Sequence, residues 1–450
     1  MKFYSTKNKN EKVNFRDAIL SGIAPDGGLF MPENFPQFSA AEKKNFAEKN
    51  FAEVAFEISK KFCGDEIPEK NLEKLIFDAF DFPIKLKKID EKNFVLELFH
   101  GPTAAFKDFA ARFMARISNF FLAEKKEKKT ILVATSGDTG GAVAAGFLGL
   151  PNFCVKILFP KNGVSEIQKA QLTGLGKNIS AIEIDGSFDD CQNLVKKSFL
   201  DRSFSEKLNL MSANSINVGR VIPQSFYYFW ASAKLQKKFP DKKIIFCVPS
   251  GNFGNLTAAI FAQKMGAPLD FLIAANNSNR PFFDFLRTGN FSPRPTVRTI
   301  SNAMDIGHPN NFYRIFEIFS GGDFSAATEN EKKITAKKIR EKIFGATFSD
   351  DATAAKIAQI SREKNYVACP HTAVGFCAIE NFCENFSAEN KIFVNVATAD
   401  PAKFREKIQK FLPKKILTPA NLEKILAAKK VFQKLPPDFV NFKKFLLEKI

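Results

Sequence analysis

The chain has 450 residues, of which 45% are hydrophobic, and a formal net charge of +18 at pH 7. This length suits two or three domains with large cores. No apolar stretch is long enough to span a membrane, and the first residues lack the apolar region of a signal peptide. The seven cysteines form no paired framework, so reduced thiols and a cytoplasmic location are expected.

The positive charge does not by itself indicate a nucleic-acid partner. Lysines are spread along the whole chain, and phenylalanine is unusually frequent at 52 residues. Enrichment in these two types is typical of an AT-rich genome. Lysine runs such as that at 125–129 are usually solvated surface. Neither nucleic acid nor a membrane is therefore expected as a partner.

The first part of the chain is predicted to be mostly helical. Apolar residues recur at helical spacing over Ala40–Lys61 and Glu69–Phe80. From Phe94 onward, short apolar runs alternate with helical patterns. The predicted strands are Phe94–Phe99, Thr130–Thr135, Cys154–Phe159, Ile179–Asp185, Lys243–Val248, Phe271–Ala275, Tyr366–Cys369 and Lys391–Ala397. This alternation predicts an α/β fold whose parallel sheets carry helices on both faces.

One lysine stands out where the first of these strands ends. Gly101 and Pro102 break the strand, and Thr103 can cap a helix that runs towards Phe121. Lys107 lies among alanines and phenylalanines in the first turns of that helix. A desolvated lysine has a lowered pKa and can form a Schiff base. The alternative is that Lys107 is an ordinary solvated lysine of a basic chain.

Two glycine-rich turns follow predicted strands at the start of helices. The first turn has the sequence TSGDTG at 135–140, and the second has SGNFGN at 250–255. Backbone N–H groups at such a helix start suit a carboxylate or a phosphate. Neither turn has the spacing of nucleotide-hydrolase or dinucleotide motifs. Two possible anion sites and a candidate buried lysine together favour a catalytic site over tight turns alone.

The chain resembles the threonine synthases, a family of pyridoxal phosphate enzymes of fold type II. The resemblance covers almost the whole chain. The motifs that carry it are GIAPDGGLFMP at 22–32, ELFHGPTAAFKDF at 97–109, SGDTG at 136–140, SANSIN at 212–217, PSGNFGN at 249–255, SNAMDIG at 301–307 and TADPAKF at 398–404. As a set and in this order, these motifs are highly specific.

The resemblance implies two lobes of parallel or mixed sheet, with helices on both faces, and a mostly helical N-terminal domain. The cofactor is expected in the cleft between the lobes. The expected parts are an N-terminal domain at 1–93, a large cofactor-binding lobe at 94–129 and 241–412, a small lobe at 130–240 and a helical C-terminal extension at 413–450. In that extension, helices are predicted over Asn421–Phe432 and Phe439–Ile450.

The resemblance also implies residue roles. Lys107 is expected to hold pyridoxal phosphate as a Schiff base and then to move protons. The expected cofactor contacts are Lys107, Asp138, Gly251, Asn252, Phe253, Gly254, Asn255 and Thr398. Thr398 is assigned to the pyridine nitrogen, and Asp138 lies near the phenolic oxygen. The expected substrate contacts are Ser136, Gly137 and Thr139 for the α-carboxylate, and Asn214, Ser215 and Arg220 for the substrate phosphate.

Each role has a structural alternative. Thr398 could bond only to the backbone, and Asp138 could cap its own helix. Asn214 and Ser215 could form a helix cap. Arg220 could belong to an ordinary ion pair at the surface.

Some positions depart from the family pattern. Asp400 and Cys369 stand where the family more often has a histidine and an acidic residue. Lys161 is a weak candidate for a phosphate-binding lysine, because the order after Pro160 is Lys-Asn-Gly. The three histidines, His100, His308 and His371, lie far apart without metal-ligand spacing, so no metal is expected.

The reaction implied by the family converts O-phospho-L-homoserine and water to L-threonine and phosphate. The resemblance therefore implies a carbon–oxygen lyase of threonine biosynthesis, and a monomer or a homodimer is expected. Two alternatives remain at this point. One is a serine or threonine dehydratase of the same fold type, and the other is a binding protein that has lost the cofactor.

Overall fold

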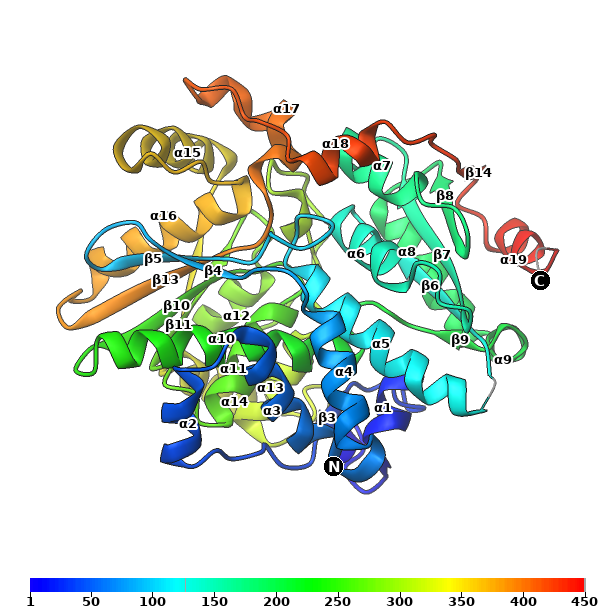
Figure 1. Cartoon of the computed structure of the whole chain (residues 1–450), viewed down its shortest axis with the longest axis horizontal. Helices are drawn as coiled ribbons and strands as arrows, with labels where there is room; N and C mark the ends of the chain where they lie inside the picture. Colours follow the sequence, from blue (N-terminus) through cyan, green and yellow to red (C-terminus); the bar gives the residue numbers. More distant parts are fainter. Residues whose placement is uncertain (126, 449–450) are drawn as a thin grey trace.

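The computed structural model of the chain describes residues 1–125 and 127–448, without the side chain of Lys125. In these residues the strands form three sheets, of six, five and three strands. The two larger sheets lie beside each other in separate lobes (Figure 1). We call the six-stranded sheet with its helices the large lobe, and the five-stranded sheet with its helices the small lobe. The α/β class predicted from the sequence is confirmed.

The large sheet is parallel except at one edge. Its strand order is β12-β11-β10-β13-β5-β4, and only β4 runs antiparallel to its neighbour. The strands are β4 (Lys85–Lys88), β5 (Asn93–Glu97), β10 (Lys243–Pro249), β11 (Phe271–Asn276), β12 (Ile343–Thr347) and β13 (Lys391–Ala397).

The central strands of the large sheet are apolar on both faces because helices cover both. In β10, Ile244 and Phe246 belong to the main core, while Ile245 and Cys247 belong to a second cluster with residues of α16. The helices of this lobe are α10 (Val218–Lys238), α11 (Gly254–Lys264), α12 (Pro281–Thr288), α13 (Phe312–Ser320), α14 (Glu329–Arg340), α15 (Asp350–Lys364) and α16 (Pro370–Asn385). Such two-sided burial is typical of parallel sheets.

The small sheet is parallel throughout, in the order β14-β8-β7-β6-β9. Its strands are β6 (Lys129–Ala134), β7 (Phe153–Pro160), β8 (Ile179–Ile184), β9 (Leu210–Met211) and β14 (Gln433–Leu435). Its helices are α6 (Asp138–Phe147), α7 (Glu166–Thr173), α8 (Phe188–Leu200) and α9 (Arg202–Leu208). Helix α5 (Lys107–Lys125) packs against α6 and α10, so it joins the two lobes.

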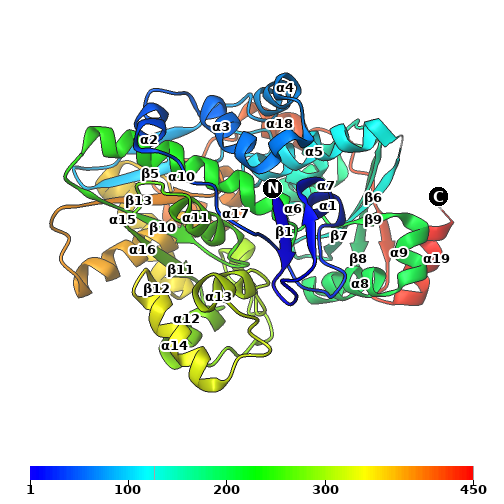
Figure 2. The same cartoon turned by 90° about the horizontal axis from the view of Figure 1, so that it is seen from below.

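The N-terminal segment packs against α10 and α5 with its helices. These are α1 (Phe15–Ser21), α2 (Ala40–Phe46), α3 (Phe51–Cys63) and α4 (Glu69–Ala79). The small antiparallel sheet also belongs here, with β1 (Lys2–Ser5), β2 (Lys12–Asn14) and β3 (Phe30–Pro32). Figure 2, which views the molecule from below, shows β1 in front of the region where the two lobes meet. None of the helices formed by the described residues combines the length and apolar character needed to cross a membrane.

The C-terminal tail runs from the large lobe to the small lobe (Figure 1, orange to red). After β13 come short helical turns at Pro401–Phe404, Arg405–Ile408 (α17) and Gln409–Phe411. Helix α18 (Ala420–Leu426) then packs on α7, strand β14 pairs with β8, and α19 (Phe439–Leu447) packs on α8. The tail therefore ties the two lobes together. The division of the chain into domains at 93, 129, 240 and 412 remains a prediction.

Some predicted elements differ from the structure. The predicted strand Tyr366–Cys369 is an irregular segment that leads into α16, with Pro370 at the first helical position. Strand β12, at the sheet edge, was not predicted; it is short and contains Gly345. Ala40–Lys61 forms two helices because Asn50 caps α3 by accepting a hydrogen bond from the N–H of Glu53.

Two further helices are shorter than predicted. Thr103 does not cap the Lys107 helix, which begins only at Lys107. The predicted helix Asn421–Phe432 already ends at Leu426, and the next residues lead into β14. The helix predicted over Phe439–Ile450 extends to Leu447, and residues 449–450 lie outside the described part of the chain.

Gly375 provides a test of how closely α16 approaches the large sheet. A Cβ atom there would lie 2.1 Å from Oδ1 of Asn395, a fully buried residue of β13. We expect Gly375→Ala to lower the free energy of unfolding by about 1–3 kcal/mol, as overpacking does in other cores. Urea unfolding of the variant and the wild type would measure this loss of stability. Gly322→Ala is the control, because nothing lies within 4 Å of its Cβ position. Equal stability of the two variants would contradict the packing described here.

Candidate active site

A cavity lies between the two lobes, where β6, β10 and β13 end. Its walls combine the lysine segment, both glycine-rich turns and the end of β13: Phe106, Lys107, Thr135, Ser136, Asp138, Thr139, Asn214, Ser215, Arg220, Ser250, Gly251, Asn252, Phe253, Gly254, Asn255, Ala303, Met304, His371 and Thr398 are among the lining residues. The fold thus gathers residues that are almost 300 positions apart in the sequence. Open α/β sheets bind ligands at these carboxyl ends of their strands.

A larger hollow, of about 820 Å³, lies elsewhere on the large lobe. Its lining residues include Lys243, Phe271 and Ile343, the first residues of β10, β11 and β12. It therefore lies at the opposite ends of the strands and contains none of the predicted site residues. The smaller cavity between the lobes is the candidate active site.

Lys107 is the first residue of α5, and a tight turn holds it in place. Ala104 has a positive φ of 54°. The carboxylate of Asp108 accepts hydrogen bonds from the N–H of Thr103 at 2.8 Å and from its hydroxyl at 2.6 Å. A Cβ atom on Gly101 would lie 2.6 Å from an oxygen of Asp108, so glycine is needed there. Asp108 thus fixes the loop from which the Lys107 helix starts.

Lys107 lines the cavity and is partly buried. Desolvation lowers the pKa of Lys107 to about 8. The positive charges of Arg220 and Lys403 also lower this pKa, whereas the negative charge of Asp138 raises it. The depressed pKa predicted from the sequence is confirmed. An amine with this pKa can take up and release protons near neutral pH.

The first glycine-rich turn is held from inside by Thr135. Its hydroxyl accepts hydrogen bonds from the N–H of Gly137 at 2.9 Å and of Gly140 at 2.8 Å. Gly137 has a φ of 133°, and a Cβ atom there would lie 2.3 Å from the carboxamide carbon of Gln168. Gly137 therefore lies behind the turn, while Ser136 and Thr139 line the cavity.

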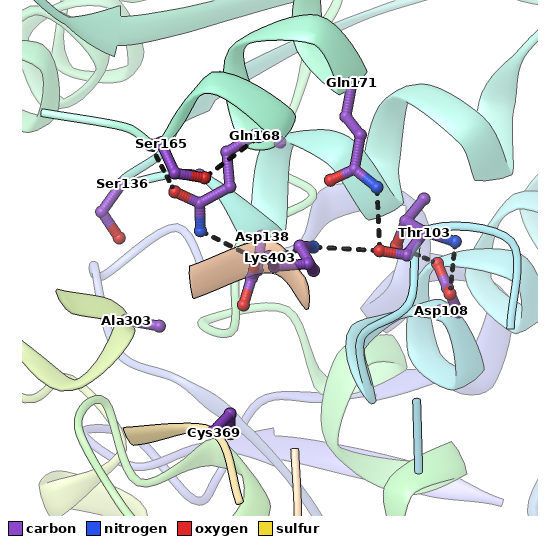
Figure 3. Close-up of polar contacts among 12 residues, drawn as sticks. Thr103, Asp108, Ser136, Asp138, Ser165, Gln168, Gln171, Ala303, Cys369 and Lys403 are labelled. Carbon is purple, nitrogen blue, oxygen red and sulfur yellow. Dashed lines mark hydrogen bonds and ion pairs between the residues drawn. The ribbon is translucent and has the colours of Figure 1, made fainter. Parts of the chain in front are cut away.

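Asp138, the first residue of α6, is buried beside a second lysine (Figure 3). Nζ of Lys403 lies 2.7 Å from its Oδ1, and Gln168 donates a hydrogen bond to the same oxygen at 2.9 Å. Burial raises the pKa of Asp138, but the positive charges of Lys403 and Lys107 outweigh this effect and hold it well below its usual range. Asp138 is therefore ionised inside the cavity.

The second glycine-rich turn leads into α11. Phe253 adopts the left-handed conformation with φ of 57°. Asn252 donates to the hydroxyl of Ser215 at 2.5 Å and accepts from the N–H of Asn310 at 2.6 Å. These contacts join the turn to the predicted substrate-phosphate residues. Gly251 is required by close packing, because its Cβ would lie 2.6 Å from the Cα of Met304.

Two buried donors that line the cavity have no hydrogen-bond partner within the described residues. They are Nε of Arg220 and Nδ2 of Asn255. Arg220 uses Nη1 to donate to the carbonyl of Ala213 at 2.5 Å, and burial lowers its pKa to about 10. Oδ1 of Asn255 accepts from the hydroxyls of Tyr227 and Tyr228 at 2.5 and 2.8 Å. Leaving a buried donor unpaired is costly, so Arg220 and Asn255 both keep unused hydrogen-bonding capacity beside the cavity.

Arg314 in α13 was not predicted from the sequence. Its side chain is fully buried and donates to the carbonyls of Phe30, Ser215 and Ile216 at 3.2, 3.2 and 2.6 Å. It also donates to Oδ1 of Asn311 at 2.6 Å. Arg314 thus ties the Ser215 loop to the N-terminal segment. No spacing in the sequence reveals this role, since the partners are carbonyl oxygens of distant segments.

His371 contributes a neutral ring to the cavity wall. Its Nε2 accepts a hydrogen bond from the N–H of Ala303 at 3.2 Å, which fixes the loop over the second turn. Desolvation lowers the pKa of His371 to about 3. The thiol of Cys369 makes a long polar contact of 3.7 Å with Nδ1 of His371 and is not among the residues that line the cavity.

Other candidates lie outside the cavity. Lys161 is exposed and pairs with Asp185 at 2.9 Å. His100 contacts Glu97 at 2.8 Å, and His308 contacts the hydroxyl of Tyr313 at 2.9 Å. Asp400 caps the turn that carries Lys403, because its Oδ1 accepts from the N–H of Ala402 at 2.8 Å.

Asn214, by contrast, is a predicted site residue that does line the cavity. Its side chain donates a hydrogen bond to the carbonyl of Ala134 at 3.1 Å.

Family comparisons cover the chain almost from end to end. Residues 2–80 match the family model "Threonine synthase N terminus", residues 84–397 match "Pyridoxal-phosphate dependent enzyme", and residues 372–446 match "Threonine synthase, C-terminal". The first match covers the N-terminal segment, and the last covers α16, β13 and the tail that follows β13.

Individual relatives agree with these matches. The threonine synthase of Buchnera aphidicola from Acyrthosiphon pisum is 41% identical over the full length of both chains. The solved structure of pyridoxal phosphate-bound threonine synthase from Brucella melitensis has a TM-score of 0.91 at 36% identity, covering 100% of this chain and 99% of that one. The Escherichia coli threonine synthase structure has a TM-score of 0.90 at 37% identity over the full length of both. The chain therefore belongs to the threonine synthase family of pyridoxal phosphate-dependent enzymes.

Proposed function

We propose that the chain converts O-phospho-L-homoserine and water to L-threonine and inorganic phosphate, with pyridoxal phosphate held by Lys107. The observation that carries the proposal is the cavity itself. It places an amine with a pKa of about 8 among residues of two anion-binding turns, beside two unpaired buried donors. A doubly anionic amino acid and a cofactor with a phosphate group both suit such a cavity.

The residues present fit the cofactor. Gly251, Asn252, Phe253, Gly254 and Asn255 lie at the N-terminus of α11, where backbone N–H groups favour phosphate. The unpaired Nδ2 of Asn255 is a further donor there. Thr398, at the end of β13, would bond the pyridine nitrogen, and Asp138 would lie near the phenolic oxygen. The bound cofactor would supply an electron sink for charge that develops at the substrate carbons.

The substrate would be held at both ends. Ser136 and Thr139, which line the cavity at the start of α6, would bind its α-carboxylate, while Gly137 would shape the turn between them. Asn214, Ser215 and Arg220 would bind its phosphate, and the unpaired Nε of Arg220 would complete a charge-assisted hydrogen bond. Arg314 would act indirectly, by fixing the carbonyls of Ser215 and Ile216.

Lys107 would move the protons. Its free amine would take the proton from Cα of the substrate and return protons at later steps. The low pKa that desolvation produces suits this exchange. His371 is neutral at the pH where the enzyme works, so it does not compete with Lys107 for protons.

A dehydratase acting on serine or threonine is the second reading, because the same fold type serves both reactions. The match of residues 2–80 to the threonine synthase N terminus favours the first reading. Release of an oxo acid from threonine, without phosphate release from O-phospho-L-homoserine, would favour the dehydratase.

We also propose a cytoplasmic enzyme that is a monomer or a homodimer and has no nucleic-acid partner. The seven cysteines are all free thiols, as expected in a reducing compartment. Sedimentation of the purified chain, with and without added DNA, would test the oligomeric state and the absence of nucleic-acid binding.

The first test is product release from O-phospho-L-homoserine. The wild type with pyridoxal phosphate should release threonine and phosphate in equal amounts, and Lys107→Ala should release neither, because no proton carrier remains. Lys414→Ala, which changes an exposed lysine, is the matched control and should behave as the wild type. Equal turnover by Lys107→Ala would disprove the role of this lysine.

Replacement of Arg220 tests the substrate-phosphate site. Arg220→Met keeps most of the buried stem but removes the guanidinium. We expect KM for O-phospho-L-homoserine to rise about 30-fold, which corresponds to a lost charge-assisted bond of about 2 kcal/mol. Exchange of the Cα proton with solvent should persist, since Lys107 is intact. Arg362→Met, at an exposed position, is the control. An unchanged KM would place the phosphate elsewhere.

The pKa of Lys107 predicts a pH dependence for capture of the cofactor. Only the neutral amine attacks the aldehyde, so capture by the cofactor-free chain should speed up as pH rises and level off near the pKa of about 8. An ordinary lysine would keep accelerating to about pH 10.4. Stopped-flow absorbance of the cofactor would record the rate, with N-acetyl-lysine as reference. A profile like that of the reference would show that the amine is not desolvated.

A further inference from the structure

Lys403 is a buried lysine that none of the roles above uses. Its side chain is fully buried, with Nζ 2.7 Å from Oδ1 of Asp138. The same amine donates a hydrogen bond to the carbonyl of Thr103 at 2.9 Å. Figure 3 shows Lys403 between Asp138 on one side and Thr103 on the other. It therefore contacts both the first glycine-rich turn and the loop before Lys107.

The position of Asp138 raises an electrostatic problem. Asp138 begins α6, in the turn that would bind the α-carboxylate of the substrate. An ionised carboxylate there repels an incoming carboxylate, and it also cancels the attraction of the helix N-terminus for anions. The turn can bind an anion only if the charge of Asp138 is neutralised locally.

The charged and titratable groups near Asp138 are few. They are Lys107 at the start of α5, Lys403 in the tail and His371 in α16, while Asp108 acts on Lys403 from the far side. His371 is neutral. Lys107 gains and loses its proton in the proposed reaction. Lys403 is the positive group that contacts the carboxylate of Asp138 directly, at 2.7 Å.

We propose that Lys403 is a positioning residue that neutralises Asp138 at the carboxylate-binding turn, which lets the turn hold the substrate α-carboxylate. The proposal rests on the proposed function, since it assigns a second residue to the same site. Lys403 keeps Asp138 ionised and fixes the direction of its side chain. Gln168 supports the same geometry by donating to Oδ1 of Asp138 from the small lobe.

Thr103 connects this ion pair to the catalytic lysine. Its carbonyl accepts from Lys403 and also from Nε2 of Gln171 in α7 at 2.8 Å. Its N–H and hydroxyl donate to Asp108, the residue after Lys107. Lys403 thus holds the carboxylate-binding turn and the Lys107 loop in one arrangement.

The test uses the full chain loaded with pyridoxal phosphate. Affinity for L-threonine, which has the α-carboxylate but no phosphate, is measured from the absorbance change of the bound cofactor at several pH values. The variants are Lys403→Met, Asp138→Asn and the double variant. Lys410→Met, an exposed lysine of the same tail, is the matched control and should bind as the wild type.

We expect Lys403→Met to lose affinity about tenfold at about pH 8. Without Lys403, the folded-state pKa of Asp138 rises, so the carboxyl group becomes protonated as pH falls. The repulsion then disappears, and affinity recovers towards that of the wild type at low pH. In the Asp138→Asn background, Lys403→Met should change affinity by less than about twofold, because no charge is left to neutralise.

Two results would overturn the proposal. One is the same loss of affinity by Lys403→Met at every pH, and the other is a tenfold further loss when Lys403→Met is added to Asp138→Asn. If Lys403→Met alone does not fold, the comparison between the double variant and Asp138→Asn decides the question. A wild type that binds no threonine would refute the proposed function instead.

The melting temperature gives a readout that is independent of the substrate. In Lys403→Met the raised folded-state pKa of Asp138 should make stability fall as pH rises through that value. In the wild type this pKa is depressed, so the stabilisation that ionised Asp138 gives to the folded state should be lost only as pH falls to strongly acidic values. The double variant has no carboxyl group at position 138, so its melting temperature should show neither of these two pH trends. A parallel pH profile for Lys403→Met and the wild type would show that Lys403 does not control the charge of Asp138.

Discussion

The cavity between the lobes buries more positive than negative charge, and the rest of the site depends on this imbalance. Lys403, Arg220 and Arg314 are buried and Lys107 is partly buried, while Asp138 and Asp108 supply the opposing charge. Burial of unpaired cations is costly, and anions bound in the cavity would offset that cost. The same desolvation gives Lys107 its low pKa. Affinity for anionic ligands and reactivity of the lysine therefore have one physical origin.

The architecture makes this arrangement possible because both sheets are parallel. Strands β6, β10 and β13 all end at the cavity, and each is followed at once by a polar turn or residue. The sheets need large cores on both faces, which the abundant phenylalanines fill. Helix α5 and the tail then fix one lobe against the other. The polar groups of the site are thus held by elements whose stability comes from apolar packing at a distance from it.

Much of this fold could be predicted from local sequence pattern. Buried strands such as β10 and β13 are continuous apolar runs bounded by charged residues and turns, so their positions were predicted within two residues. The edge strand β12 escaped prediction because it is short and half-buried, and Tyr366–Cys369 was wrongly taken as a strand because an apolar run before Pro370 has the same pattern. Lys107 and both turns carry local signals. Lys403, Gln168 and Arg314 carry none, because their partners lie on distant segments and only the folded chain defines them.

The path of the tail has a consequence for how the protein matures during synthesis. Thr398 and Lys403 leave the ribosome long after Lys107 and both glycine-rich turns, and β14 later still completes the edge of the small sheet beside β8. Until then Asp138 lacks its buried counter-charge, and no strand covers β8 on that side. A chain that lacked this last part would lose a wall of the cavity, the counter-charge of Asp138 and the edge strand of the small sheet together.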